Sequence, residues 1–384
     1  MKVVKTTKLE EGMVTAVPVK TKHGQLVVNN GVTLTDQLIA RISFYGIDCI
    51  RIEGEPEVTE PAPKVSAPKE QPEPEAVQEE VPAPGNVQNP TYSQRIKSSP
   101  AFQSFQFDYS RSAGELKHTL APILAKSGKI DKDTLCETAL PLLEKAHNSI
   151  EMFDMLHNMR AVNDSIYAHS LNVALIAGLF GKWLRLPREK IEMLVLAGLL
   201  HDVGKTKIPP EILDKPGKYT DEEFALVRKH PSLGYRILSA IPDDKLDPHI
   251  KNAALMHHER CDGSGYPQGL KGNEIDDIAQ IIAIADVYDA MTAARSYRAP
   301  LCPFQVIEAF EKDGLQKYKP KYILTFLEHI ASTYQSNRVL LTDGKGAEIV
   351  MLNKQSLSRP IVKRDDGTCI DLSRTPELSI QSLL

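Results

Sequence analysis

Histidines with acidic neighbours are the residues of this chain best suited to chemistry. His201 is followed directly by Asp202 at the end of an apolar segment, and Asp286 interrupts the apolar run IIAIADVYDAM. A carboxylate in an apolar run is costly unless it is paired, hydrogen-bonded or metal-bound. The candidate metal ligands chosen on this basis are His169, His201, Asp202, His230, His257, His258 and Asp286.

This mixed set of donors predicts a centre with two metals. Imidazole nitrogens and carboxylate oxygens together suit iron, manganese, zinc or cobalt. Seven protein ligands exceed the four of a tetrahedral zinc site, so we expect two metals that share a bridging carboxylate. We assign the bridge to Asp202. Two metals roughly 3.5–4 Å apart can activate water and stabilise both oxygens of an in-line phosphoryl displacement, which indicates phosphodiester chemistry.

Each candidate ligand also has an ordinary structural interpretation. A lone His169 on an apolar helix would usually be a satisfied core histidine, and a lone His230 before Pro231 a surface or capping residue. Asp286 alone would suit a buried, hydrogen-bonded aspartate. The metal hypothesis gains its weight because all of these features occur together and in this order.

The bulk composition fits a globular cytoplasmic protein. The net charge of −4 over 384 residues does not indicate binding to nucleic acid or membranes. The longest apolar run, LVLAGLL, is far too short to span a bilayer, and the N-terminal residues lack the apolar core of a signal peptide. Five scattered cysteines without a CxxC pair indicate reduced thiols rather than a zinc or disulfide framework.

The composition divides the chain into four segments. Residues 1–53 predict a small α+β module, with the β-like runs MVTAVPV and GQLVVNN in a hairpin, a helix capped by Thr35, and a strand in IDCIRIE. Residues 54–91 are rich in Pro, Glu and Ala and predict a disordered linker. Residues 92–335 read as a helical domain, and residues 336–384 as a β-like C-terminal appendage. The expected fold class is therefore mainly α.

Helical periodicity in the third segment positions the candidate ligands. The two most apolar stretches, 164–184 and 187–200, resemble inner helices of a bundle. The helical stretches are 131–156, 164–184, 187–200, 221–241, 277–294 and 302–314.

Six motifs in this domain are similar, in order, to those of the HD-GYP family. This family is a branch of the HD metal-dependent phosphohydrolases that degrades the bacterial second messenger cyclic di-GMP. The similarity covers about residues 160–315 and implies an HD-type helical bundle with the seven metal ligands named above. The motifs are YAHSLNVA, LLHDVGKTKIP, ILDKPGKYTDEEF, VRKHPSLGYRIL, HHERCDGSGYP and IADVYDAMTAARSYR.

The resemblance also implies roles for residues around the metals. Asp202 and Lys205 would be catalytic, with Lys205 reaching a phosphate or assisting the hydrolytic water. Asp289 is expected beside the metal shell rather than in it. Gly263 and Gly265 would permit close backbone approach and unusual dihedral angles, and Tyr266 would contact a guanine base. The expected substrate-binding residues are Lys205, Gly265, Tyr266, Pro267, Arg295 and Arg298.

Two positions depart from the family pattern. Ser165 stands where some members carry a glutamate that helps to hold a third metal, so we expect two divalent metals. Iron and manganese are the first candidates, and other first-row metals suit the same donors. Cys261 stands where a bulky residue is common, which concerns local packing and removes no ligand.

The resemblance implies a phosphodiesterase in which a metal-bound hydroxide opens cyclic di-GMP to linear pGpG, with GMP as the product of a second cleavage. One alternative is a regulatory module that binds the nucleotide, or docks onto diguanylate cyclase domains, with little turnover. Another is an HD hydrolase of other nucleotides such as ppGpp, against which GSGYP and RSYR argue. No nucleic-acid or membrane partner is expected. The sequence leaves open the metal's identity, homodimer formation, and the roles of the N-terminal module and the C-terminal appendage.

Overall fold

The computed structural model of the protein describes most of the chain outside residues 53–95. The predicted linker and most of the helix expected after Thr35 lie outside the described residues, as do Ser165, Arg295 and Arg298. The described residues are 2–20, 26–35, 38–39, 42, 47, 49–52, 96–124, 131–145, 149–159, 166–213, 215, 217–241, 246–293 and 301–384.

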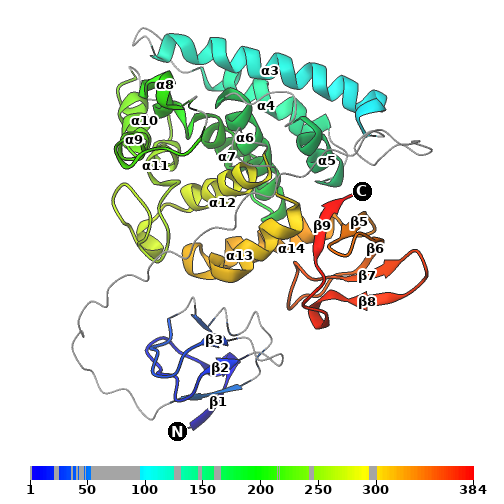
Figure 1. The fold of residues 1–384 in the computed structure, drawn as a ribbon. Coiled ribbons are helices and arrows are strands. Elements are labelled where there is room, and N and C mark those ends of the chain that lie inside the picture. Colours follow the sequence, from blue (N-terminus) through cyan, green and yellow to red (C-terminus); the bar gives the residue numbers. More distant parts are fainter. Residues whose placement is uncertain are drawn as a thin grey trace.

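The described chain is mainly helical, which confirms the expected fold class (Figure 1). The predicted helical stretch 221–241 is divided into two helices at Arg228 and Lys229. In the part of the chain described, no helix combines the length and the apolar character needed to cross a membrane. The elements of this region are α3 (Pro100–Leu124), α4 (Lys132–Lys145), α5 (Ser149–Met159), α6 (Ile166–Trp183), α7 (Arg188–Leu200), η2 (Val203–Lys207), α8 (Pro210–Leu213), α9 (Asp221–Val227), α10 (His230–Ser239), α11 (Pro248–Met256), α12 (Asp277–Thr292), α13 (Pro303–Lys317) and α14 (Pro320–Thr333).

Helices α6, α7 and α12 form the centre of the bundle. Their sequences are apolar around most of the helix, and α6 is buried almost continuously from Ala168 to Gly181. Gly198 on α7 lets the two backbones meet, since an added Cβ would lie 2.5 Å from the Ala174 Cα on α6. This contact brings the helix that carries His169 against the helix that ends at His201.

Helix starts around the centre follow ordinary capping chemistry. Thr220 and Glu223 form a capping box at the start of α9. Asp247 caps α11 by accepting a hydrogen bond from the His249 backbone N–H at 2.9 Å. Asp276 caps α12 in the same way through Ile278, also at 2.9 Å. These local signals fix where the helices that carry candidate ligands begin.

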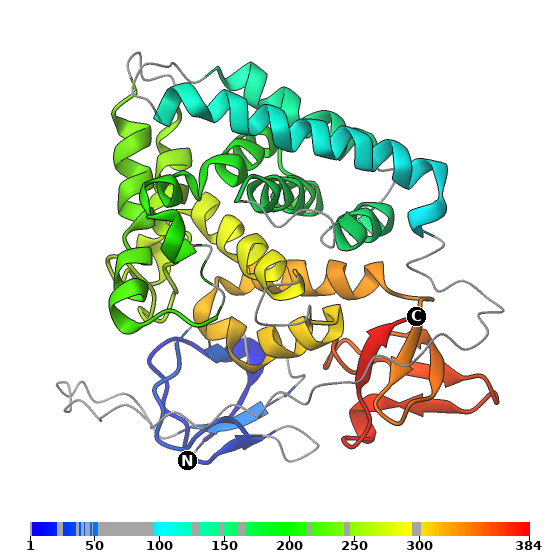
Figure 2. The same ribbon diagram turned by 45° about the horizontal axis from the view of Figure 1, so that its top comes forward.

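The C-terminal segment folds into one antiparallel sheet that packs on the helices. Val339, Ile349 and Val362 belong to the same apolar core as Phe310 of α13 and Ile330 of α14. Figure 2 shows the red strands at one end of the bundle and the green helices α8–α11 at the other. Runs 338–353 and 360–373 contain strands as predicted, whereas β9 was not predicted. The strands are β5 (Arg338–Leu341), β6 (Gly346–Met351), β7 (Ile361–Arg364), β8 (Cys369–Asp371) and β9 (Ile380–Leu383), in the order β8-β7-β6-β5-β9.

The N-terminal segment has a small core of its own, which includes Leu9, Leu34 and Ile50. The predicted hairpin is confirmed in part, because β2 pairs antiparallel with β3 but begins only at Val19, the last residue of the run MVTAVPV. The predicted third strand is confirmed by β4. Thr35 accepts a hydrogen bond from the Leu38 backbone N–H at 3.4 Å, as expected of a helix cap. The strand β1 was not predicted, and it pairs with β4. The strands are β1 (Lys2–Lys5), β2 (Val19–Lys20), β3 (Leu26–Val28) and β4 (Cys49–Ile52).

A carboxylate on α13 fastens the C-terminal sheet to the bundle. Glu311 accepts hydrogen bonds from the Leu357 backbone N–H at 2.5 Å and the Ser358 backbone N–H at 3.3 Å. The Ser358 hydroxyl donates to the same carboxylate. Removing the acceptor leaves these donors without a protein partner at a packed junction.

We expect Glu311→Ala to lower the free energy of unfolding by about 1–3 kcal/mol, the usual cost of unsatisfied buried donors. The measurement is urea unfolding, with Glu328→Ala as the control because Glu328 is an exposed residue of the neighbouring α14. Equal stability of the two variants would contradict this role for Glu311.

Candidate metal centre

The fold brings all seven predicted metal ligands to one place. His169 comes from the first turn of α6, and His201 and Asp202 from the junction of α7 with η2. His230 is the first residue of α10. His257 and His258 follow α11 directly, and Asp286 lies in the middle of α12. Five segments far apart in the sequence therefore meet here.

A glycine allows the closest of these approaches. A Cβ added at Gly204 would lie 2.0 Å from the His230 carbonyl oxygen and 2.5 Å from the Gly234 nitrogen. No other residue type fits between η2 and α10 without moving one of them. Because Gly204 lies just after Asp202, the contact sets the separation between Asp202 and His230.

Backbone carbonyls orient three of the imidazoles. The Nδ1 atom of His201 lies 2.7 Å from the Gly198 carbonyl oxygen, and that of His230 lies 2.8 Å from the Val227 carbonyl oxygen. The Nδ1 atom of His257 lies 3.0 Å from the Ala253 carbonyl oxygen. A carbonyl can only accept, so Nδ1 carries the proton and Nε2 presents its lone pair. The Nε2 atoms of His230 and His257 lie 3.2 Å apart, so both lone pairs face the same point. Histidines that bind metals usually donate their other ring N–H to a protein oxygen in this way.

Asp202 lies between two sets of imidazoles. Its Oδ1 atom lies 3.3 Å from Nε2 of His230 and 3.7 Å from Nε2 of His257. Its Oδ2 atom lies 3.4 Å from Nε2 of His201 and 3.6 Å from Nε2 of His169. One carboxylate oxygen therefore faces each set, which is the geometry expected of a bridging ligand.

The donor atoms fit divalent metals. Three sets of three residues each have ligand atoms within 4.8 Å of one another. Among the described residues, Nε2 of His201 and Oδ1 of Asp202 are buried without a hydrogen-bond partner. Buried polar atoms are rarely left unpaired, and a metal would satisfy both. The sets are His230, His257 and His258; His169, His201 and Asp286; and His201, Asp202 and His257.

The protonation states also suit metal binding, which needs neutral imidazoles and ionised carboxylates. Burial lowers the pKa of His230 to about 4 and that of His258 to about 3. Burial also holds the pKa of His257 well below its usual range. Burial alone would raise the pKa of Asp202, but Lys205 and His201 hold it well below the usual range.

His169 is held by carboxylates on both of its nitrogens. Its Nδ1 lies 2.8 Å from Asp289 Oδ2, and its Nε2 lies 3.0 Å from Asp286 Oδ1. Burial alone would lower the pKa of His169, but these two hydrogen bonds raise it to about 9. Asp289 contacts His169 from the side away from the other imidazoles' lone pairs, in the position expected of a residue beside the metal shell.

The GSGYP loop lies directly against the imidazoles. The Tyr266 ring stacks on His258 with ring centres 4.6 Å apart and an angle of 22° between the planes. Gly263 has φ +80°, and a Cβ at Gly265 would lie 2.4 Å from the Glu259 Cα. The expected unusual dihedral is thus found at Gly263 and the close backbone approach at Gly265, while Pro267 is exposed at the end of the turn.

A buried glutamate that sequence reasoning missed holds this loop. Glu259 is 2% exposed. Its carboxylate accepts hydrogen bonds from the backbone N–H groups of Gln268 at 2.7 Å and Leu270 at 3.0 Å. The two hydrogen bonds fix the end of the loop at Gln268 and Leu270, the residues on either side of Gly269. The only local signal was its position directly after His258, because its partners are backbone groups that the sequence does not display.

The remaining predicted residues are placed as follows. The Lys205 ammonium group donates to Asp202 Oδ2 at 2.5 Å, beside the ligand sets. Cys261 is buried and contacts Gln280, and its backbone N–H donates to the Lys317 carbonyl at 2.8 Å. Arg295 and Arg298 lie outside the described residues. Their predicted contacts with substrate stay predictions.

Comparisons with known proteins find similarity to an HD domain family and to phosphodiesterases of cyclic dinucleotides. Residues 145–322 match the sequence profile of a family described as HD domain. A cyclic di-GMP phosphodiesterase of Pseudomonas aeruginosa is 34% identical over 209 residues, which are 54% of this chain and 50% of that protein. A 3'3'-cGAMP-specific phosphodiesterase of Vibrio cholerae is 36% identical over 178 residues, 46% of this chain and 34% of that protein. A cyclic di-GMP phosphodiesterase response regulator of Xanthomonas campestris is 44% identical over 123 residues, 32% of each chain.

The region that carries all seven candidate ligands therefore matches the HD domain family, in agreement with the resemblance found in the sequence motifs. The chain spans half or less of the length of these curated relatives.

The contact between Asp289 and His169 predicts a loss of metal affinity when Asp289 is changed. We expect Asp289→Ala to weaken metal binding about 10- to 100-fold, as is typical when an outer-shell partner of a ligand is removed. Asp289→Asn, which keeps an acceptor oxygen without the charge, should lose less. The measurement is titration of the folded apoprotein with Mn(II).

Asp277→Ala is the matched control, since Asp277 is an exposed residue at the start of the same helix. An Asp289→Ala protein that is folded and binds metal like this control would contradict the positioning role.

Proposed function

We propose that this protein is a phosphodiesterase that hydrolyses cyclic di-GMP to linear pGpG, with GMP formed by a second cleavage. The observation that carries the proposal is Asp202, whose two carboxylate oxygens face separate sets of histidines. The relatives named as cyclic di-GMP and cGAMP phosphodiesterases support the substrate class. Two divalent metals, iron or manganese, would supply a Lewis acid and an activated water at this point.

The protein's own residues would prepare the site in three ways. His230, His257 and His258 would hold one metal, and His169, His201 and Asp286 the other, with Asp202 shared. The imidazoles of His230, His257 and His258 are neutral and present lone pairs without having to lose a proton first, whereas His169, whose pKa is raised by Asp286 and Asp289, would have to lose one. Burial of Asp202 and His201 keeps bulk water away from the reacting groups and strengthens the local electrostatic interactions.

Charged and aromatic side chains would bind the substrate beside the metals. Lys205 already lies at Asp202 and carries a donor for a phosphate oxygen or for the hydrolytic water. Tyr266 would meet a guanine base, with Gly265 and Pro267 shaping the loop that carries it. Arg295 and Arg298 would add planar donor forks for phosphate and base.

The test is hydrolysis of cyclic di-GMP by anaerobically purified protein loaded with Fe(II) or Mn(II), with products resolved by chromatography. We expect metal-dependent formation of pGpG or GMP. Asp202→Ala should reduce the rate by more than about 100-fold, because loss of a shared ligand exceeds the loss of an outer-shell partner. Asp133→Ala is the control, since Asp133 is exposed at the start of α4.

A substrate panel separates this proposal from the other two functions. Bound cyclic di-GMP without product from the metal-loaded protein would identify a regulatory module instead. Faster turnover of ppGpp or deoxynucleotides than of cyclic dinucleotides would identify an HD hydrolase of another class. Including 3'3'-cGAMP determines which cyclic dinucleotide is preferred.

A further inference from the structure

An arginine to which the sequence motifs assign no role lies at the edge of the candidate metal centre. Arg228 follows α9 and precedes His230 by two residues. Its guanidinium carbon lies 4.6 Å from the centre of the Tyr266 ring and 5.9 Å from the centre of the Phe224 ring. Both distances are within the range of cation–π attraction. Arg228 therefore connects the loop of Tyr266 to the surface helix α9.

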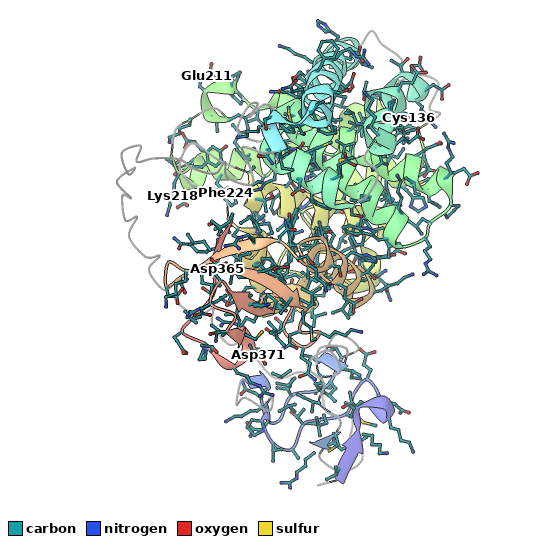
Figure 3. All side chains as sticks on the ribbon, turned by 90° about the vertical axis from the view of Figure 1, so that its right-hand side faces the viewer. Cys136, Glu211, Lys218, Phe224, Asp365 and Asp371 are labelled. Atoms are coloured by element: carbon teal, nitrogen blue, oxygen red, sulfur yellow. The ribbon has the colours of Figure 1, made fainter. Side chains whose placement is uncertain are left out.

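These contacts form a continuous stack that begins at a candidate ligand. His258 packs against Tyr266, Tyr266 against Arg228, and Arg228 against Phe224. The stack ends at the surface, where the Phe224 side chain is 48% exposed. Figure 3 labels Phe224 close to Lys218, at the edge of the helical domain. An exposed aromatic ring aligned with a planar cation is suited to contact a flat ligand.

The same backbone segments that position the ligands also position this stack. The Arg228 backbone N–H donates to the Phe224 carbonyl at 2.9 Å, and the Val227 carbonyl holds the His230 ring at 2.8 Å. On the other side, Glu259 fixes the loop of Tyr266 through two backbone N–H groups. Arg228 is not a candidate ligand, but these hydrogen bonds fix its position relative to the candidate metal ligands.

The charge of Arg228 is also available to a ligand. Among the residues that the structure describes, no carboxylate forms an ion pair with its guanidinium group. A guanidinium group can stack on a purine with its face and donate to phosphate with its edge. Each base that stacks on an aromatic or planar cationic side chain adds to the affinity. Cyclic di-GMP offers both chemistries, two purine bases and two phosphodiesters.

We propose that Arg228 and Phe224 form a purine-binding platform at the rim of the centre, which receives the guanine base that lies beside Tyr266. This proposal rests on the proposed function, because it assumes a cyclic dinucleotide at the metals. Arg228 is a substrate-binding residue in this arrangement, and selects dinucleotides over diesters that have no base.

The experiment compares Arg228→Ala, Arg228→Lys and Phe224→Ala with the wild type on two substrates. They are cyclic di-GMP and bis(p-nitrophenyl) phosphate, a diester without a purine. Arg236→Ala is the matched control, since Arg236 is an exposed arginine of the adjacent α10. We expect Arg228→Ala to raise KM for cyclic di-GMP by about 10-fold or more, from lost stacking. Its loss in kcat/KM should be at least about 10-fold greater for cyclic di-GMP than for the diester without a base.

Arg228→Lys keeps the charge and loses the planar face, so it should recover little of the lost affinity. Three results would overturn the platform: a KM within two-fold of the Arg236→Ala control, equal losses on both substrates, or full recovery by lysine. If the wild type binds cyclic di-GMP without cleaving it, the proposed function fails. Dissociation constants for cyclic di-GMP, compared among the same variants, then test whether the platform binds the base. If the wild type neither binds nor cleaves it, both proposals fail.

Discussion

The candidate centre depends on one buried carboxylate, Asp202, that lies between two groups of imidazoles. Asp202 is 1% exposed within a helical core, where an ionised group without compensation is strongly unfavourable. Lys205 donates to one of its oxygens, and metals held by the imidazoles on both sides would supply the remaining positive charge. The close packing around it follows from this requirement. Gly198 lets α6 and α7 meet, and Gly204 lets η2 reach the start of α10, so that ligands from separate helices converge on Asp202.

The substrate-facing features are extensions of the same scaffold. The His230 ring is oriented because its Nδ1–H donates a hydrogen bond to the carbonyl of Val227, the residue before Arg228. The Tyr266 ring stacks on the His258 ring. Glu259, the next residue, accepts a hydrogen bond from the Gln268 backbone N–H and so holds the loop just after Tyr266. Segments that carry candidate metal ligands thereby also fix the rim where the proposed base would bind. A change at the rim should therefore be tested separately for its effects on metal content and on substrate affinity.

Sequence patterns predicted the inner helices, the convergence of the seven candidate ligands and most C-terminal strands, because these depend on local periodicity and on motif order. They missed features that depend on distant contacts. The stretch 221–241 has helical periodicity throughout, but the helix is interrupted at Arg228 and Lys229. His230 therefore begins a new helix and faces Asp202. The strand β9 forms by pairing with β5. Glu259 acts by accepting hydrogen bonds from backbone groups of a loop. Neither partner is visible in the local sequence.

The most direct test of a centre built on Asp202 is the anomalous diffraction of crystals of the Mn(II)-loaded protein. We predict two metal peaks, one on each side of the Asp202 carboxylate and roughly 3.5–4 Å apart. One peak should contact His230, His257 and His258, and the other His169, His201 and Asp286. A single peak, or two peaks that do not share Asp202, would contradict the bridging role. A third peak near Ser165 would contradict the two-metal count.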